Sequence, residues 1–261
     1  MIELSVVIVT FNSAKTIVDC LSSIIQADSN SQIEIIVVDN VSQDGTPALI
    51  REQFPNVRLI ENRENIGFGA GNNIGVARAT GRYLALINPD LSVHQDTLAI
   101  LINCLKQDSS IGMVGPRTYA PTGTVQMTAR PPYTLLHILI TYWHLRWLSS
   151  QLTYGAYHAI NHHADQPTDA AWLQGSCLLM ARSLYQAIGG FDEEYFLYME
   201  DVDLSEQVLS TGKRVVYCPD ASATHIGGAS TGGEPLLRVR GYHISPLYHF
   251  GKNKGEQASS S

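Results

Sequence analysis

Apolar residues along the first 115 positions alternate between two spacings. Short β-branched runs predict buried strands, and between them apolar residues recur every three or four positions, the spacing of a helix. The predicted strands are residues 4–10, 33–38, 57–61, 83–87 and 111–114. The predicted helices are residues 14–27, 46–54, 69–79 and 95–107. This alternation predicts an α/β fold with a mostly parallel central sheet and helices on both faces.

The pattern is less regular after Gly115. Weaker strand and helix patterns follow at residues 170–173, 176–181, 184–188, 201–210 and 215–217. Residues 116–132 are polar and rich in turn formers, and the polar tail from Lys252 predicts disorder. We therefore predict one domain with two halves, residues 1–115 and 116–251, and a disordered tail at 252–261.

Composition excludes several classes of protein. The chain has 261 residues, 44% of them hydrophobic, and its 17 basic and 24 acidic residues give a net charge of −7. A chain with this negative charge is a poor nucleic-acid binder, so no nucleic-acid partner is predicted. For the same reason, an anionic ligand would need a local cation or a helix N-terminus to bind. Four scattered cysteines without a Cys-x-x-Cys motif predict reduced thiols, and the start lacks a signal-peptide pattern, which together predict a cytoplasmic protein.

Small polar or acidic residues end four consecutive predicted strands. These strand ends are Thr10-Phe11-Asn12, Asp39-Asn40, Asn65-x-Gly67 and Asn88-Pro89-Asp90. Turns and helix caps explain each one alone, but four together are better explained by a ligand, because ligands of open parallel sheets bind outside the carboxyl ends of the strands.

Three further features suggest catalytic chemistry. Asp90, beside a proline-stiffened turn, is a suitable ligand for Mg²⁺ or Mn²⁺. The acidic run from Glu200 to Asp203 opens a predicted helix, where it either caps the helix or holds a general base with a supporting partner. His225 lies in a Gly/Ser/Thr-rich segment and could complete a metal site with Asp90.

Six motifs in order resemble family 2 glycosyltransferases, in particular the rhamnosyltransferase-like branch. They are Val-Val-Ile-Val-Thr-Phe-Asn, Val-Val-Asp-Asn-x-Ser-x-Asp-Gly-Thr, Asn-x-Gly-Phe-Gly-x-Gly-Asn-Asn, Asn-Pro-Asp, Gly-Gly-Phe-Asp-Glu with Glu-Asp-Val-Asp-Leu, and His-x-Gly-Gly-x-Ser. The resemblance spans about residues 3 to 231. It implies a GT-A fold, a divalent metal and a nucleotide-diphosphate-sugar donor that is dTDP- or UDP-linked, with rhamnose as the candidate sugar. It also implies transfer with inversion to a saccharide or lipid-linked saccharide in cell-surface polysaccharide synthesis.

The resemblance also implies residue roles. Asp201 would be the catalytic base, and Asp90 and His225 would bind the metal. The residues expected to contact the nucleotide sugar are Thr10, Phe11, Asn12, Asp39, Asn65, Gly67, Asn72 and Asn88. The residues expected to support the base or bind the acceptor are Glu200, Asp203 and Trp172.

Asn88 departs from the family pattern, because it stands where the metal-binding motif has its first acid. This neutral amide motivates a second hypothesis, a non-catalytic nucleotide-sugar-binding protein that retains the fold. A third hypothesis is a nucleotidyltransferase with a similar sheet. Such an enzyme would have a basic glycine-rich first loop, whereas Lys15 is the only basic residue in positions 10–16, which disfavours this hypothesis.

Residues 134–152 form a predicted helix rich in Leu, Ile, Tyr and Trp. Such a helix is either packed on the core or lies at a membrane interface, where Trp, Tyr and a basic residue suit the headgroup boundary. The second interpretation predicts a peripheral protein at the inner face of the cell membrane with a lipid-linked acceptor.

Overall fold

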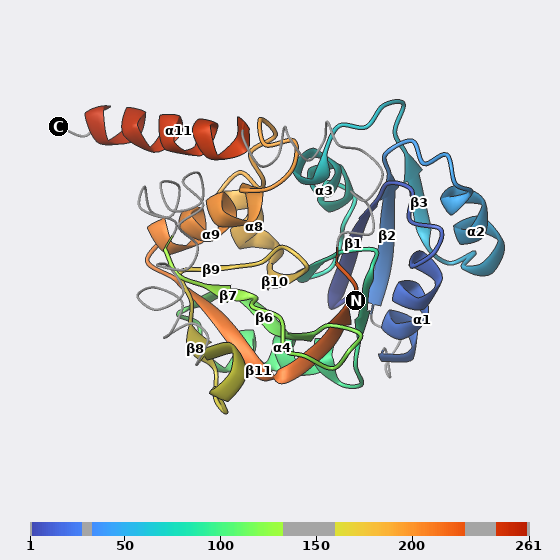
Figure 1. Ribbon diagram of the computed structural model, residues 1–261, viewed down its shortest axis with the longest axis horizontal. Coiled ribbons are helices and arrows are strands. Elements are labelled where there is room, and N and C mark those ends of the chain that lie inside the picture. Colours follow the sequence, from blue (N-terminus) through green and yellow to red (C-terminus); the bar gives the residue numbers. More distant parts are fainter. Residues whose placement is uncertain (1, 28–32, 133–159, 228–243, 260–261) are drawn as a thin grey trace.

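The computed structural model describes residues 2–27, 33–132, 160–227 and 244–259 (Figure 1). The first half alternates strands and helices as predicted. Its elements are β1 (Leu4–Thr10), α1 (Ile17–Ala27), β2 (Ile33–Asp39), α2 (Thr46–Gln53), β3 (Arg58–Glu61), α3 (Phe68–Val76), β4 (Tyr83–Ile87), β5 (Leu91–Val93), α4 (Thr97–Gln107) and β6 (Ile111–Tyr119). The predicted helix at 134–152 lies outside the described residues, and no helix within them is long and apolar enough to span a bilayer.

The second half has shorter elements and two differences from the prediction. Its elements are β7 (Ala129–Arg130), β8 (Thr168–Asp169), β9 (Trp172–Leu173), β10 (Cys177–Ala181), α8 (Arg182–Ala187), α9 (Glu200–Ser210), β11 (Arg214–His225) and α11 (Ser245–Ser259). Strand β11 is much longer than the predicted strand at 215–217, and α11 is a helix where a disordered tail was expected from Lys252.

One mixed sheet organises the fold. Among the described residues, nine strands form it in the order β3-β2-β1-β4-β10-β6-β11-β5, with β8 paired to β11. The neighbouring pairs β2–β3, β1–β2, β1–β4 and β6–β11 are parallel, whereas β10 is antiparallel to both β4 and β6. The predicted α/β class and mostly parallel sheet are confirmed.

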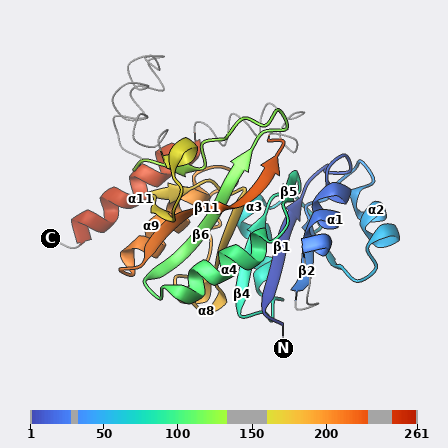
Figure 2. The ribbon, with the colours of Figure 1, turned by 90° about the horizontal axis from the view of Figure 1, so that it is seen from below.

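Helices cover both faces of this sheet, because its strands are apolar on both sides. Side chains of β1 alternate between two buried clusters: Leu4, Val6 and Ile8 pack with α1 and α4, while Val7 and Val9 pack with α3 and α8. Figure 1 shows α1 and α4 on one side of the sheet and α3 and α8 on the other, and Figure 2 shows α1 and α4 from below.

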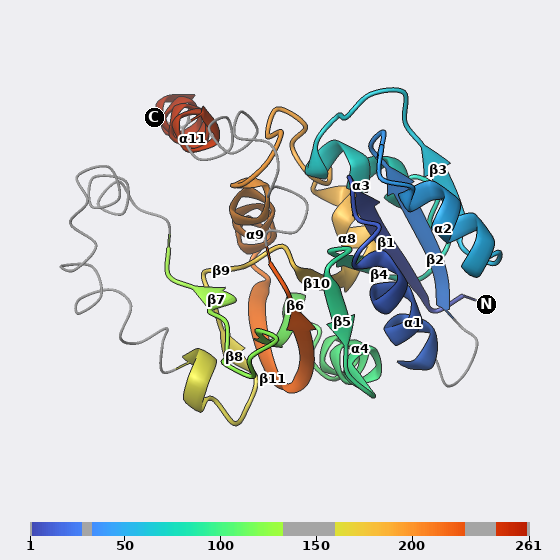
Figure 3. The ribbon, with the colours of Figure 1, turned by 45° about the vertical axis from the view of Figure 1, so that its right-hand side comes forward.

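The end of β11 creates a link that positions the site. After pairing with β6, β11 extends alongside β5 (Figure 3) and pairs with it in antiparallel fashion. In this register His225 lies opposite Leu91. Because Leu91 directly follows Asp90, this pairing brings two residues 135 positions apart in sequence to the same sheet edge.

Helix α11 is anchored to α9 and to the segment before it. Lys252 Nζ lies 2.8 Å from Asp192 Oδ2 and 2.7 Å from Asp203 Oδ1. Burial opposes the lysine charge, but these two carboxylates outweigh it and raise the pKa of Lys252 to about 12. The Tyr195 hydroxyl lies 3.0 Å from His249 Nδ1. These polar contacts hold the helix against the rest of the domain as far as Lys252.

Candidate active site

The first two strand ends hold one buried carboxylate. Thr10 Oγ1 donates a 2.8 Å hydrogen bond to Asp39 Oδ1, which also accepts one of 2.6 Å from Ser42 Oγ. The Ser42 amide donates to Asp39 Oδ2 at 2.8 Å. Thr10 and Asp39 are both buried, so the structure brings these two predicted site residues together with a fixed geometry.

Asn12 joins the loops that follow β1 and β2. The Asn12 backbone amide donates a hydrogen bond to Ser42 Oγ at 2.8 Å, and the Asn12 side-chain Oδ1 accepts one from the Gln43 backbone amide at 2.8 Å. Asn12 adopts φ 52°, a left-handed conformation that asparagine tolerates better than most residues. Phe11, between Thr10 and Asn12, is half-buried at the same edge.

Gly67 is required by its surroundings. It adopts φ 90°, and a Cβ built there would lie 2.4 Å from the Phe196 carbonyl oxygen. Its amide donates to Asn65 Oδ1 at 3.1 Å. Asn72, one turn into α3, is buried and donates to the Phe68 carbonyl at 3.0 Å, while its Oδ1 has no hydrogen-bond partner. This loop thereby connects the predicted nucleotide side to the segment that precedes α9.

Asp90 and His225 face each other at the end of β4. Asp90 Oδ1 lies 3.2 Å from His225 Nε2, and both side chains are about 5% exposed. The Gly227 amide donates to Asp90 Oδ2 at 3.0 Å, which fixes the carboxylate. Asn88, two positions before Asp90, is half-buried, and its backbone amide donates a hydrogen bond to the Ser176 carbonyl at 2.9 Å.

Gln126 determines which nitrogen of His225 carries the proton in the neutral ring. Its Nε2 donates to the His225 carbonyl at 2.8 Å, so its Oε1 is the atom 3.1 Å from Nδ1 and must accept from it. Nε2 then presents a lone pair to the Asp90 carboxylate, and it is buried without a hydrogen-bond partner. Two acceptors in contact require a cation or a proton between them, and metal-binding histidines commonly donate their other ring N–H in this way.

The Asp90–His225 pair therefore fits a divalent metal. No group of three or more His, Cys, Asp or Glu side chains with metal-binding geometry occurs within the described residues. A metal here would need further ligands from substrate phosphates and water, the arrangement that Mg²⁺ commonly adopts.

The acidic run lies at the beginning of α9. Tyr198 and Met199, immediately before it, both adopt positive φ, which turns the chain sharply into the helix. Asp201 Oδ2 accepts the Gly175 amide at 2.9 Å, and Oδ1 accepts the Val202 amide at 2.9 Å. The carboxylate is thus oriented by two backbone donors.

Burial raises the pKa of both carboxyl groups. The Glu200 pKa lies well above its usual range, chiefly through burial and further through the charge of Asp201. Burial also raises the Asp201 pKa, although the Gly175 and Val202 amides and the Arg130 charge oppose it. A carboxylate with a raised pKa is a stronger base than an exposed one, which suits proton removal from a hydroxyl.

The other two predicted acceptor-side residues are positioned differently. Asp203 Oδ2 accepts from Gln207 at 2.6 Å and its Oδ1 contacts Lys252, so this carboxylate is paired with α11. Trp172, on β9, lies beside Arg130, whose guanidinium carbon is 5.7 Å from the indole centroid.

Sequence reasoning missed Gln126 and Arg130. Both lie in the stretch 116–132 that was interpreted as turn-rich, and only non-local pairing brings them to the site: Gln126 with His225, and Arg130 with Trp172. A glutamine and an arginine among turn residues carry no spacing signal that could have identified them.

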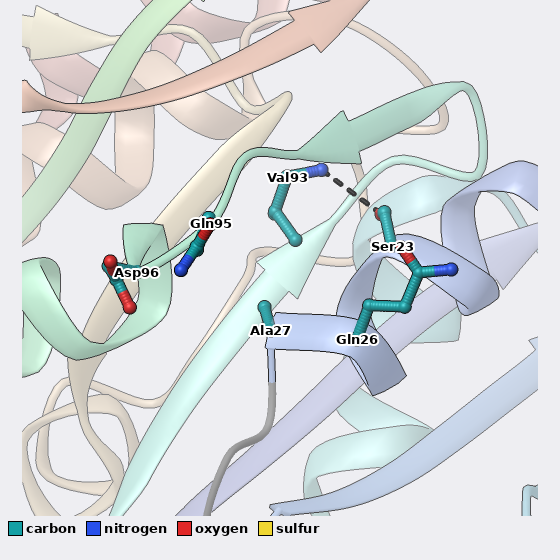
Figure 4. Close-up of a pocket in the computed structure, with 6 residues that line it drawn as sticks. All are labelled: Ser23, Gln26, Ala27, Val93, Gln95 and Asp96. Atoms are coloured by element: carbon teal, nitrogen blue, oxygen red, sulfur yellow. Dashed lines mark hydrogen bonds between the residues drawn. The ribbon is translucent and has the colours of Figure 1, made fainter.

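Figure 4 shows a pocket that is lined by other residues. Ser23, Gln26, Ala27, Val93, Gln95 and Asp96 line it, and the Val93 amide donates to Ser23 Oγ at 3.1 Å. It contains none of the predicted site residues.

Comparisons with known proteins identify the family and the fold of this chain. The family model described as Glycosyl transferase family 2 matches residues 5–173. An N-acetylglucosaminyl-diphospho-decaprenol L-rhamnosyltransferase from Mycobacterium tuberculosis is 30% identical in an alignment that covers 93% of this chain and 82% of that protein.

Two solved structures share the fold. GalNAc-T7 with UDP, GalNAc and Mn²⁺ matches 86% of this chain and 44% of its own, with a TM-score of 0.66 and 18% identity. The mannosyltransferase PcManGT from Pyrobaculum calidifontis, in complex with GDP-Man and Mn²⁺, matches 91% of this chain and 60% of its own, with a TM-score of 0.62 and 23% identity. The chain spans less than two thirds of each solved chain, and the likeness confirms the predicted GT-A fold. From the family match and the 30% identical relative, we conclude that this chain belongs to glycosyl transferase family 2.

Proposed function

We propose that this chain transfers a sugar, with inversion, from a nucleotide-diphosphate sugar to a lipid-linked saccharide. The proposal rests on one observation: a possible cation site and a possible general base occur in the same domain. The Asp90–His225 pair can hold a cation for a diphosphate, and Asp201 is a fixed carboxylate with a raised pKa.

The donor is proposed to lie along the carboxyl ends of β1, β2 and β4. Asp39, held by Thr10 and Ser42, offers fixed oxygens to the nucleoside. The other residues proposed for the nucleotide sugar are Phe11, Asn12, Asn65, Gly67, Asn72 and Asn88, as the family resemblance implies. dTDP and UDP are the proposed carriers, with L-rhamnose as the candidate sugar by analogy with the mycobacterial relative.

Asp90 Oδ1 and His225 Nε2 are the proposed ligands of Mg²⁺ or Mn²⁺. When bound, the metal would offset the negative charge that develops on the departing diphosphate. Because Asn88 replaces the first acid of the motif, this chain supplies one carboxylate from that motif, and we expect weaker metal binding than with two.

Asp201 is proposed as the general base. Its carboxylate takes the proton from the acceptor hydroxyl while that oxygen forms a bond to the anomeric carbon and the bond from this carbon to the diphosphate oxygen breaks. One displacement at the anomeric carbon inverts its configuration, so one carboxylate suffices. Glu200, whose pKa is raised by burial and by the Asp201 charge, is the proposed supporting partner of Asp201. Asp203 acts by holding α11 through Lys252.

The acceptor is proposed from the relative, whose name specifies an N-acetylglucosaminyl-diphospho-decaprenol substrate. A lipid-linked acceptor would place the enzyme peripherally at the inner face of the cell membrane, with residues 134–152 as the proposed contact. The net charge of −7 disfavours strong attraction to anionic lipid, so this contact would be mainly apolar.

A transfer assay tests the proposal. The purified chain is given dTDP-rhamnose, UDP-glucose, UDP-N-acetylglucosamine or GDP-mannose, with Mn²⁺ and an N-acetylglucosaminyl-diphospho-lipid, and product is measured by mass spectrometry. We expect transfer from a dTDP- or UDP-linked sugar. Donor binding without transfer or hydrolysis would instead support the non-catalytic hypothesis that Asn88 motivates.

A further inference from the structure

Buried polar atoms without a hydrogen-bond partner concentrate around Asp201. Six such side-chain atoms occur in the described residues, and three of them are Arg130 Nε, Trp172 Nε1 and Glu200 Oε2. A buried donor without a partner is costly, so such atoms commonly indicate a position that a ligand fills.

Arg130 and Trp172 are held together by backbone pairing. They lie opposite each other in the β7–β9 pair, and the Ala171 amide donates to the Arg130 carbonyl at 3.2 Å. The guanidinium carbon lies 5.7 Å from the indole centroid, while the indole also packs with Tyr195, Met199 and Val202. The arginine therefore rests on an aromatic surface that is itself fixed.

The Arg130 charge is not neutralised by a close carboxylate. No Asp or Glu lies within ion-pair distance of Arg130 among the described residues. The Arg130 charge opposes the rise in the Asp201 pKa that burial causes. Strand β9, which pairs with Arg130, is also joined to α9 by the 3.4 Å hydrogen bond from the Leu173 amide to Ser205 Oγ, so Arg130 lies close to the helix that carries Asp201. A planar guanidinium with a free Nε–H is well suited to bind two oxygens of a phosphate.

We infer that Arg130, supported by Trp172, binds a phosphate of the acceptor, so that the sugar presenting its hydroxyl to Asp201 is one that carries a phosphate. This inference rests on the proposed function and names the residues that recognise the phosphate of its proposed acceptor. Without a cation, the Glu200–Asp201 pair would repel an anionic acceptor. The donor diphosphate has its own cation site at Asp90 and His225, which leaves Arg130 available to the acceptor.

Paired acceptors test the inference. One is N-acetylglucosaminyl diphosphate on an undecyl chain, and the other is undecyl N-acetylglucosaminide, which lacks the phosphates. At saturating donor and Mn²⁺, the quantity measured is the ratio of kcat/KM for the phosphorylated acceptor to that for the neutral one. We expect wild type to prefer the phosphorylated acceptor about 10–100-fold, the value of charge-assisted hydrogen bonds to a phosphate.

Arg130→Gln is expected to reduce this ratio to about 1–3, and Arg130→Lys to an intermediate value, because lysine keeps the charge but loses the planar fork. Trp172→Phe keeps an aromatic surface but removes Nε1–H, and is expected to lower the ratio about 3–10-fold. Thermal shift with UDP or dTDP confirms that each variant is folded and binds nucleotide.

The possible results are distinct. If Arg130 only supports the charge of Asp201, Arg130→Gln lowers kcat equally on both acceptors and moves the acid limb of the pH profile to higher pH, which overturns the inference. An unchanged preference together with weaker nucleotide binding would place Arg130 on the donor and also overturn it. If wild type uses both acceptors equally, the inference fails and the proposed function stands; if it uses neither, the proposed acceptor class itself is wrong.

Discussion

Asp201→Asn removes the proposed base while changing little else. Asparagine has nearly the same volume, but only one of its two terminal atoms can accept a hydrogen bond. One of the 2.9 Å bonds from the Gly175 and Val202 amides is therefore lost, at a cost of about 1 kcal/mol in stability. General-base catalysis contributes about 10²–10⁴ in rate, so kcat is expected to fall by that factor, or about 3–5 kcal/mol of barrier.

The matched control is Glu200→Gln. Burial and the Asp201 charge raise the Glu200 pKa, which favours the protonated acid, and glutamine resembles that form. We expect this variant to lose less than about tenfold in kcat, because no general-base contribution is removed.

Initial rates of nucleoside diphosphate release with acceptor, measured from pH 4 to 9, check both variants. Because the Asp201 pKa is raised, wild-type activity should increase with pH as this carboxyl deprotonates, and Asp201→Asn should lack that limb. Thermal shift with UDP or dTDP should show unchanged donor binding in both. If Glu200→Gln loses as much activity as Asp201→Asn, or Asp201→Asn turns over normally, the assignment of the base is refuted.

Three further predictions concern the metal and the fold. Asp90→Asn should weaken Mn²⁺-dependent UDP or dTDP binding about 10–100-fold by calorimetry and leave binding in EDTA unchanged; equal weakening in both would contradict the metal role. In Gly75→Ala the added methyl group would lie 2.4 Å from Val7 Cγ1, which should lower the free energy of unfolding by about 1–3 kcal/mol, whereas Gly251→Ala, with nothing within 4 Å, should not be destabilised in the same urea titration. Burial raises the pKa of Glu34, but hydrogen bonds from Ser5, Thr80 and Gly81 outweigh this effect and lower it. The ionised Glu34 carboxylate therefore stabilises the folded protein fully above about pH 4.5, and this contribution is lost as pH falls through the lower folded-state pKa. The difference in unfolding free energy between wild type and Glu34→Gln should therefore shrink at low pH, and a constant difference from pH 7 to 3 would be contrary to this reasoning.

The strand ends could be predicted because their signals are local. β4 is a continuous apolar run and β1 is one from Val6 to Val9, and the polar residue after each run marks where the buried strand ends. In a parallel sheet these ends meet at one edge, so the proximity of Thr10 and Asp39 followed from the pattern alone.

The rest of the site depends on pairing between distant segments. β5 has only three residues and forms against the end of β11, more than 130 positions later, so neither strand has a sufficient local pattern at that point. The two-residue strands β7 and β9 place Arg130 beside Trp172 in the same way. In α11, a polar composition suggested disorder, but Lys252 binds two carboxylates that the local sequence does not reveal.

The configuration of the product tests the central claim most directly. Proton NMR of the purified product gives the anomeric configuration of the newly transferred sugar, which is compared with that of the donor. A single displacement assisted by Asp201 predicts the inverted configuration in all of the product. Retention of the donor configuration would contradict the account, because it requires chemistry that one base on the acceptor side cannot supply.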